Sequence, residues 1–172
     1  MCAGSFGLET SGQSSNFNRL FSPCENDSLL EMRDKAKKID RDLNAFTRLT
    51  KDIYHRILEA EAKGIYRHGS SVLEGYTKND SLFKIVVTYE GDRDTYISQY
   101  YFSKSKIFYV LKSLKHYAPP KWDAKSKIVK EDIIEYFLTE KGLAVNNTGM
   151  KVTRDKLQLE AEALAYETLL KQ

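Results

Sequence analysis

Histidine and cysteine are the residues of this chain that most often bind metals or act as nucleophiles, so their spacing is examined first. The three histidines are His55, His68 and His116, and the two cysteines are Cys2 and Cys24. No two histidines are four residues apart, as in a helical zinc site, and neither cysteine has the other close to it in sequence. We therefore expect no metal site and no cofactor.

Acid–base catalysis would need titratable groups gathered in one cleft with shifted pKa values. His116, Lys121 and Asp123 are close in the sequence, but nothing in the sequence indicates such a cleft around them. The segment Gly64–Gly69 lacks the spacing and the strand–turn–helix setting of a phosphate-binding loop. We expect the protein not to be an enzyme.

The segment from His116 to Lys127 holds the candidates for partner binding. It contains the only tryptophan of the chain and two consecutive prolines, which cannot donate to a strand ladder, and so predicts a loop. Because Trp and Tyr concentrate binding energy in a small area, His116, Tyr117 and Trp122 are candidate partner-binding residues. The alternative, which we favour, is that the loop folds back and Trp122 plugs the open end of the sheet.

The composition predicts a single globular domain. The chain has 172 residues, of which 41% are hydrophobic and 30% charged. Its net charge of +3 comes from 27 basic and 24 acidic residues that are intermixed, which does not favour nucleic-acid binding. The eleven tyrosines favour pleated, half-buried surfaces and hence β-structure.

The first part of the chain predicts a lead followed by a long helix. Residues 1–26 are rich in Ser, Gly and Asn and are expected to form a flexible lead, with a single domain over 27–172. Ser28-Leu29-Leu30-Glu31 has the pattern of a capping box. Apolar residues then recur at three- and four-residue steps, which predicts a helix over about 29–63, with a break possible near 44–50.

From residue 70 the hydrophobic period falls to two, which predicts an antiparallel sheet. A last helix follows, with Thr153 as its expected N-cap and Leu157, Ala161 and Leu164 along its central apolar stripe, widened by Leu159 and its neighbours. The fold class is α+β: a long N-terminal helix, an antiparallel meander of five or six strands, and a C-terminal helix on the same face as the first. The expected strands lie at about 72–76, 83–89, 96–102, 107–114, 133–138 and 143–145.

Two hairpins echo each other, at Tyr101–Ile107 and Tyr136–Leu143. The first, read from Tyr100 as Tyr-Tyr-Phe-Ser-Lys-Ser-Lys-Ile, resembles a Tyr-Tyr-Phe-x-x-Gly-Lys-Leu hairpin of a loose group of uncharacterised bacterial exported proteins and lipoproteins. In that group the hairpin follows a Lys-Ile strand that leads to a glycine, matched here by Lys84-Ile85 and Gly91, whereas Ser105 replaces the glycine of the turn. The resemblance covers about residues 70–150 and implies a location in the bacterial envelope and a non-enzymatic role.

The first residues agree with that location. Cys2-Ala3-Gly4-Ser5, followed by a Ser- and Asn-rich stretch, has the pattern of a mature bacterial lipoprotein, with Cys2 as the site of lipid attachment and Met1 in place of a removed signal peptide. The alternative is that Met1 is the natural start, Cys2 an ordinary residue and the protein cytoplasmic. No run approaches the roughly 20 apolar residues that cross a bilayer.

Together these observations predict a non-catalytic, lipoprotein-like binding or structural domain of the bacterial envelope or periplasm. Its partner would be a protein or another envelope component, and its membrane contact would be the lipid on Cys2. The alternatives are an inhibitor or immunity-type interaction module that uses the open sheet face and the Trp122 loop, or a cytosolic protein of unknown function.

Overall fold

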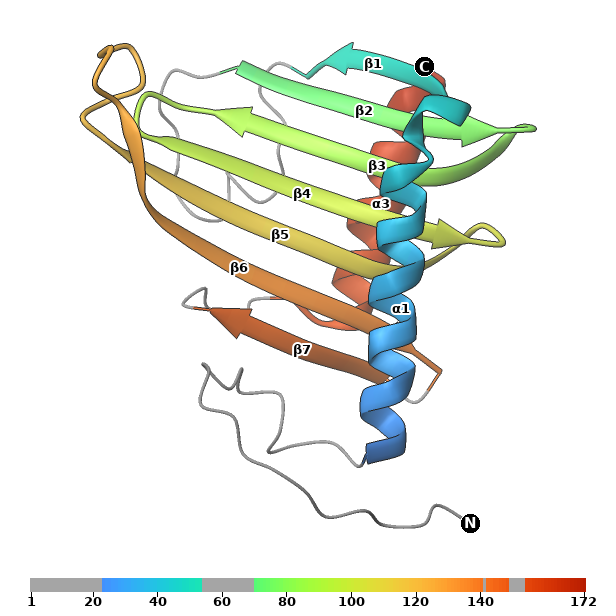
Figure 1. Ribbon diagram of the computed structural model, residues 1–172. Helices are drawn as coiled ribbons and strands as arrows, with labels where there is room; N and C mark the ends of the chain where they lie inside the picture. Colours follow the sequence, from blue (N-terminus) through green and yellow to red (C-terminus); the bar gives the residue numbers. More distant parts are fainter. Residues whose placement is uncertain (1–22, 54–69, 141, 149–153) are drawn as a thin grey trace.

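The computed structural model describes residues 23–53, 70–140, 142–148 and 154–172 (Figure 1). Cys2, His55, His68 and the expected cap Thr153 lie outside these ranges, as do most of the expected lead and the second half of the expected long helix.

The described chain forms one antiparallel sheet whose seven strands follow each other in sequence order. Period-two alternation and short links make this meander the simplest arrangement, because each strand pairs with the next. The predicted α+β class and meander are confirmed, with seven strands instead of five or six. The strands are β1 (Thr47–Asp52), β2 (Ser70–Lys78), β3 (Ser81–Glu90), β4 (Asp94–Ser103), β5 (Lys106–Ala118), β6 (Lys127–Thr139) and β7 (Gly142–Thr148).

The N-terminal helix is shorter than the apolar periodicity predicts. Helix α1 spans Pro23–Arg41, so Ser28 lies inside it and is not its cap. A short 3-10 turn, η2 (Leu43–Ala45), follows, and residues 47–52 then form edge strand β1, which pairs with residues 72–77 of β2. The predicted helix over 29–63 is therefore wrong over 42–52, because residues 47–52 pair with β2, and its part at 54–63 lies outside the described residues.

The two helices pack on opposite faces of the sheet, which corrects the prediction of a single covered face (Figure 1). Tyr100 belongs to the core shared with the C-terminal helix, and its neighbour Tyr101 belongs to the core shared with α1. Adjacent strand residues point to opposite faces, so two consecutive buried tyrosines require a layer on each side. The central strands are thus buried on both faces.

Helix α3 (Lys156–Lys171) begins at Asp155, which accepts a hydrogen bond from the Gln158 backbone, while the Gln158 side chain accepts one from the Asp155 backbone. This capping box replaces the expected Thr153 cap. The expected central stripe is also wrong, because Leu157 is 75% exposed and Leu164 64% exposed. The stripe that packs on the sheet consists of Leu159, Glu162, Ala163, Tyr166 and Leu170.

Two hairpins turn within two residues that have left-handed backbone conformations. Asn79 and Asp80 join β2 to β3 with φ of 50° and 57°, and Lys104 and Ser105 join β4 to β5 with φ of 51° and 61°. Such turns match the right-handed twist of the strands they connect.

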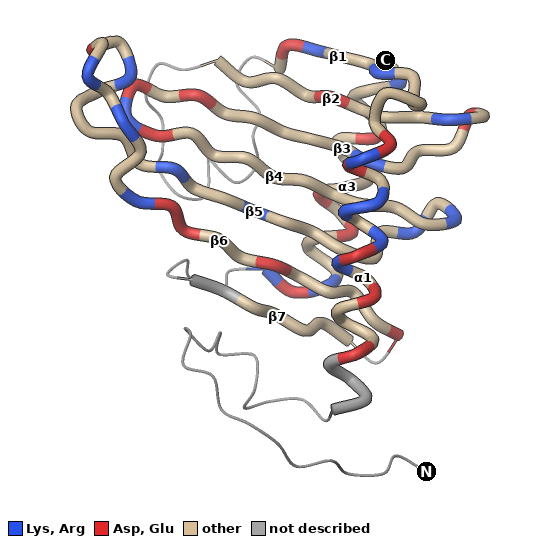
Figure 2. The backbone as a smooth tube through the Cα atoms, in the orientation of Figure 1, with Lys and Arg blue, Asp and Glu red and all other residues tan. Residues whose placement is uncertain are grey.

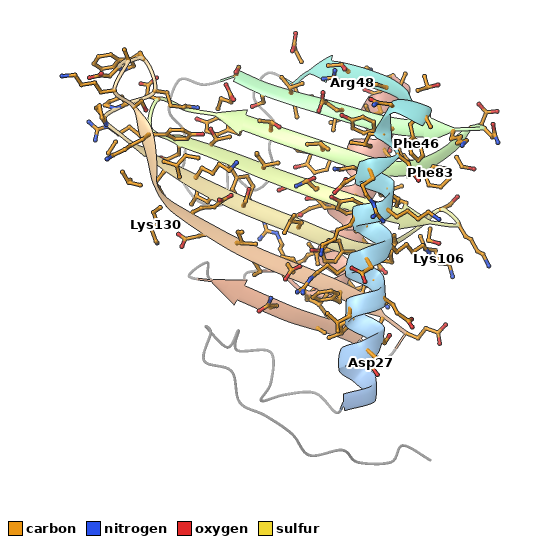
Figure 3. All side chains as sticks on the ribbon, in the orientation of Figure 1. Asp27, Phe46, Arg48, Phe83, Lys106 and Lys130 are labelled. Atoms are coloured by element: carbon orange, nitrogen blue, oxygen red, sulfur yellow. The ribbon has the colours of Figure 1, made fainter. Side chains whose placement is uncertain are left out.

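Both helices cross the same end of the sheet and leave the β5–β6 connection at the other end (Figure 1). Lys106, beside the β4–β5 turn, and Lys130, near the start of β6, mark these two ends in Figure 3. No helix in the described part of the chain is both long and apolar enough to cross a bilayer.

Candidate functional site

A buried carboxylate, Glu135 of β6, organises the contact between the sheet and α1. Arg33 of α1 donates to both of its oxygens, from Nε at 2.8 Å and from Nη2 at 2.6 Å. The Tyr109 hydroxyl donates at 2.5 Å and the Asn146 side chain at 2.7 Å. Burial raises the pKa of Glu135, but these bonds to its charged form outweigh burial and hold the pKa below its usual value.

A second carboxylate, Asp40 of α1, bonds to the next strands of the same face. Lys84 donates to it at 2.5 Å, and the Tyr101 hydroxyl lies 2.9 Å from its other oxygen and 3.0 Å from Gln99 Oε1. Burial lowers the pKa of Lys84 despite its partner. Burial and the adjacent carboxylate raise the pKa of the Tyr101 phenol, which keeps it neutral at ordinary pH.

The opposite face has a matching cluster around Glu162 of α3. Lys112 Nζ lies 2.9 Å and the Tyr100 hydroxyl 3.0 Å from Glu162 Oε2, and Arg154 bonds to the other oxygen. The Lys112 ammonium also lies 5.5 Å and 5.8 Å from the ring centres of Tyr100 and Tyr136. A lysine this deeply buried requires such a counter-charge.

These three carboxylates join each helix to the sheet, and each bonds to a tyrosine hydroxyl and to a cation. The arrangement positions helices and holds charges in pairs, which is a structural task. Sequence reasoning missed all three clusters. A signal was present, because Lys112 and Glu135 stand at strand positions flanked two residues away on both sides by apolar residues.

His116 lies near the end of β5, on the same face as α3. Its Nδ1 lies 2.7 Å from Asp94 of β4, and its Nε2 lies 3.6 Å from Asp132 of β6, which also accepts from Lys130 at 2.7 Å. In the described ranges, no three His, Cys, Asp or Glu side chains are gathered closely enough to hold a metal ion.

The acid–base group considered from the sequence is not assembled. Asp123 accepts from the Lys125 backbone at 2.8 Å, and Lys121 Nζ donates to Thr95 at 3.0 Å, so neither is a partner of His116. Each of these side chains has a local structural role.

The connection between β5 and β6 is an ordered loop. The Lys121 backbone donates to the Asp92 carbonyl at 2.8 Å, which ties the loop to the β3–β4 turn. Ser126 closes the loop, because its backbone donates to the Asp123 carbonyl and its hydroxyl to the Pro119 carbonyl, each at 2.9 Å.

This loop holds Trp122 in solvent. The Trp122 side chain is 78% exposed, so the favoured prediction that it plugs the sheet is wrong. The loop's bonds run along the backbone and through Lys121 and Ser126, and they leave the indole on the outside. Of the three candidate binding residues, Tyr117 is half-buried with the Lys121 ammonium 5.3 Å from its ring centre, and His116 is held by aspartates.

A shallow hollow of about 500 Å³ lies between α3 and the β4–β5 turn. Apolar side chains from Phe102, Ile107 and Leu138 form its floor, and Lys156, Glu160 and Glu167 stand among its other lining residues. These charged groups come from one helix and form no cluster with the buried networks.

No protein-family model, curated protein or solved structure matches the chain.

Proposed function

We propose that this chain is a non-catalytic binding domain of the bacterial envelope, held at a membrane by a lipid on Cys2, and that it contacts its partner through Trp122. The observation that carries the proposal is the 78% exposed indole on a loop fixed by its own hydrogen bonds. A loop backbone that is already held in place loses little conformational entropy when the aromatic side chain it carries binds a partner.

The three charged clusters described above support the view that the helices and sheet form a rigid scaffold for the loop. The Glu135 and Glu162 pairs lie between a helix and the sheet, and Asp40, whose side chain is 40% exposed, pairs with buried Lys84. Such pairs are strongly destabilising to break, so they fix helix positions on the two faces. The rigid sheet then presents the loop.

The envelope location rests on sequence features. Cys2-Ala3-Gly4-Ser5 precedes a Ser- and Asn-rich stretch, and the Tyr100–Ile107 hairpin resembles that of bacterial exported proteins. Acyl chains on one cysteine would hold a domain of this kind at a bilayer surface.

Fractionation of cells that express the natural gene tests the tether. We expect the unchanged protein and a Cys24→Ser variant in the membrane fraction, labelled by a fatty acid, and a Cys2→Ser variant released and unlabelled. Cys24 is the matched control because it is the only other cysteine. An unchanged protein found wholly in the cytosolic fraction, or a Cys2→Ser variant that keeps the label, contradicts the proposal.

A further inference from the structure

One of the short segments with an excess of positive charge forms the connection between β5 and β6. Residues 119–130, which form the β5–β6 loop and the start of β6, contain four of the 27 basic residues and one of the 24 acidic residues. The segment therefore carries a net charge of +3, and residues 104–115 carry four lysines and no acidic residue. Figure 2 shows the basic residues of this loop at the end of the sheet away from α1.

The same segment exposes large apolar side chains. Besides Trp122, it holds Ile128 and Val129, which are 46% and 55% exposed. These are three of the seven large hydrophobic residues that are exposed in the described ranges, and no other segment of this length holds as many. Burying these side chains against another surface would be favourable, because it removes apolar area from water.

The loop and strand starts project beyond the neighbouring strands. Asp94 at the start of β4 pairs with His116, and beyond it Tyr117 and Ala118 pair with Ile128 and Lys127 of β6. The Tyr117 backbone also donates to the Arg93 carbonyl at 2.7 Å. The loop thus extends past the β4–β5 ladder at the end of the sheet away from α1, with the β3–β4 turn bonded to it through Asp92 and Arg93 (Figure 1). We call residues 117–130 the hairpin tip.

The one acidic residue of the loop does not oppose an anionic partner strongly. Asp123 accepts from the Lys125 backbone at 2.8 Å, a bond within the loop that occupies one of its oxygens. Lys125 and Lys127 are exposed, and Lys130 bonds to Asp132 while remaining largely in solvent. Nearby Glu131 lies 3.8 Å from Lys115, which balances its charge.

We propose that the hairpin tip docks on an anionic phospholipid surface, with Trp122, Ile128 and Val129 in the interfacial layer and the lysines on lipid phosphates. This inference rests on the proposed function and names the partner of its binding loop. A tryptophan beside aliphatic and lysine side chains suits this layer, since the indole has an apolar body and a polar N–H. A projecting tip needs no pocket in its partner, and a bilayer accepts it without one.

An acidic protein is the competing partner, and the charge alone would suit it. The apolar residues decide between the two. Trp122 lies on the loop, whereas Ile128 and Val129 lie at the start of β6, where the pairing with β5 shifts its register. An interfacial lipid layer accepts apolar side chains spread in this way without a matching pocket.

Vesicle binding by the full-length Cys2→Ser protein tests the inference without any contribution from a lipid anchor. Trp122 is the only tryptophan, so its fluorescence reports on the tip alone. With vesicles of phosphatidylcholine and phosphatidylglycerol, we expect a blue shift of emission, protection from acrylamide quenching and co-sedimentation. With vesicles of phosphatidylcholine alone, we expect none of these.

Variants assign the binding to the tip. Each lysine near an anionic surface contributes enough that a Lys125→Gln/Lys127→Gln double variant should bind about 30-fold more weakly. A Lys37→Gln/Lys38→Gln variant removes the same charge from exposed positions on α1 and should bind as before. The Trp122→Ala variant should bind vesicles about tenfold more weakly in a sedimentation assay. The Leu157→Ala variant, which removes a similarly exposed apolar side chain from α3, should bind as before.

Three results would overturn the inference. One is the absence of binding to anionic vesicles. Another is an equal loss of vesicle affinity in the two double lysine variants, which would mean that the attraction is not specific to the hairpin tip. The third is binding without a change in Trp122 emission, which would place the contact elsewhere. If the protein does not bind vesicles but the Cys2→Ser substitution still releases it from cell membranes, the lipid tether is supported and only the proposed docking surface is wrong.

Discussion

At the scale of single residues, the buried charges are the most constrained feature of the protein. A carboxylate inside a protein raises the free energy of the folded state unless cations and donors compensate for its lost water. Glu135 has such compensation from Arg33, Tyr109 and Asn146. Each of these partners comes from a different element, so the interaction exists only in the assembled fold.

Replacing Glu135 by Gln should lower the free energy of unfolding by about 1–3 kcal/mol at neutral pH, because the charged bonds between Glu135 and Arg33 are lost. The folded-state pKa of Glu135 is lowered, so its stabilising contribution is full above its ordinary pKa of 4.5 and is lost as the pH falls through the folded-state pKa. The difference in the free energy of unfolding between the unchanged protein and the Glu135→Gln variant should therefore become smaller in acid. Urea unfolding followed by circular dichroism over a series of pH values measures it.

A Glu131→Gln variant is the control for that measurement. Glu131 is on the same strand, but its side chain is 3.8 Å from Lys115 near the surface, so its loss should change stability little. If the loss of unfolding free energy in Glu135→Gln stays constant from neutral pH into acid, the carboxylate charge does not contribute to stability as described.

At the scale of elements, the β4–β5 turn departs from its resemblance at one position. The similar hairpins have glycine where this chain has Ser105, and Ser105 adopts φ of 61°. Left-handed backbone is unfavourable for residues with a Cβ atom, whereas glycine adopts it freely. Ser105 therefore adopts this conformation at a local cost in free energy.

Ser105→Gly should raise the free energy of unfolding by about 0.5–1 kcal/mol, since relief of the left-handed strain exceeds the entropy that glycine adds to the unfolded chain. Ser105→Ala keeps the Cβ atom and should bring no gain. Thermal and urea unfolding of the three proteins measure the difference. If both variants change stability equally, strain at this position is not the cause.

At the scale of the whole molecule, the two helices hold one end of the sheet and leave the hairpin tip free at the other (Figure 1). The buried clusters and the proposed contact surface thereby lie at opposite ends of the sheet. The buried clusters lie beneath α1 and α3, whereas Trp122 touches neither core.

Trp122→Ala should leave the free energy of unfolding within about 0.5 kcal/mol of the unchanged protein, because the indole is already in solvent. Phe137→Ala, which removes a fully buried ring, should cost about 3–5 kcal/mol. Circular dichroism is the appropriate measurement, since Trp122→Ala removes the only tryptophan. A loss of several kcal/mol for Trp122→Ala would mean that the side chain packs against the domain.

Strand positions were predictable because alternation and turn residues are local signals. The hairpin from Ser81 to Ser103 and the return strand at 143–145 follow from them. The helix prediction failed after Arg41 because apolar spacing in 42–53 fits a helix as well as an edge strand. Of the candidate site, only Trp122 was found at the surface, and neither its exposure nor the neighbouring Ile128 and Val129 could be known from spacing.

The sequence by itself determined an α+β class, an antiparallel meander and a terminal helix, since each depends on residues near one another in the chain. Only the tertiary structure decided that the helices cover opposite faces, that Lys112, Glu135 and Glu162 are buried charges, and that Trp122 points into solvent. The physical reason is that burial depends on which distant element arrives. A strand residue becomes core or surface only when a helix from elsewhere in the chain packs on its face.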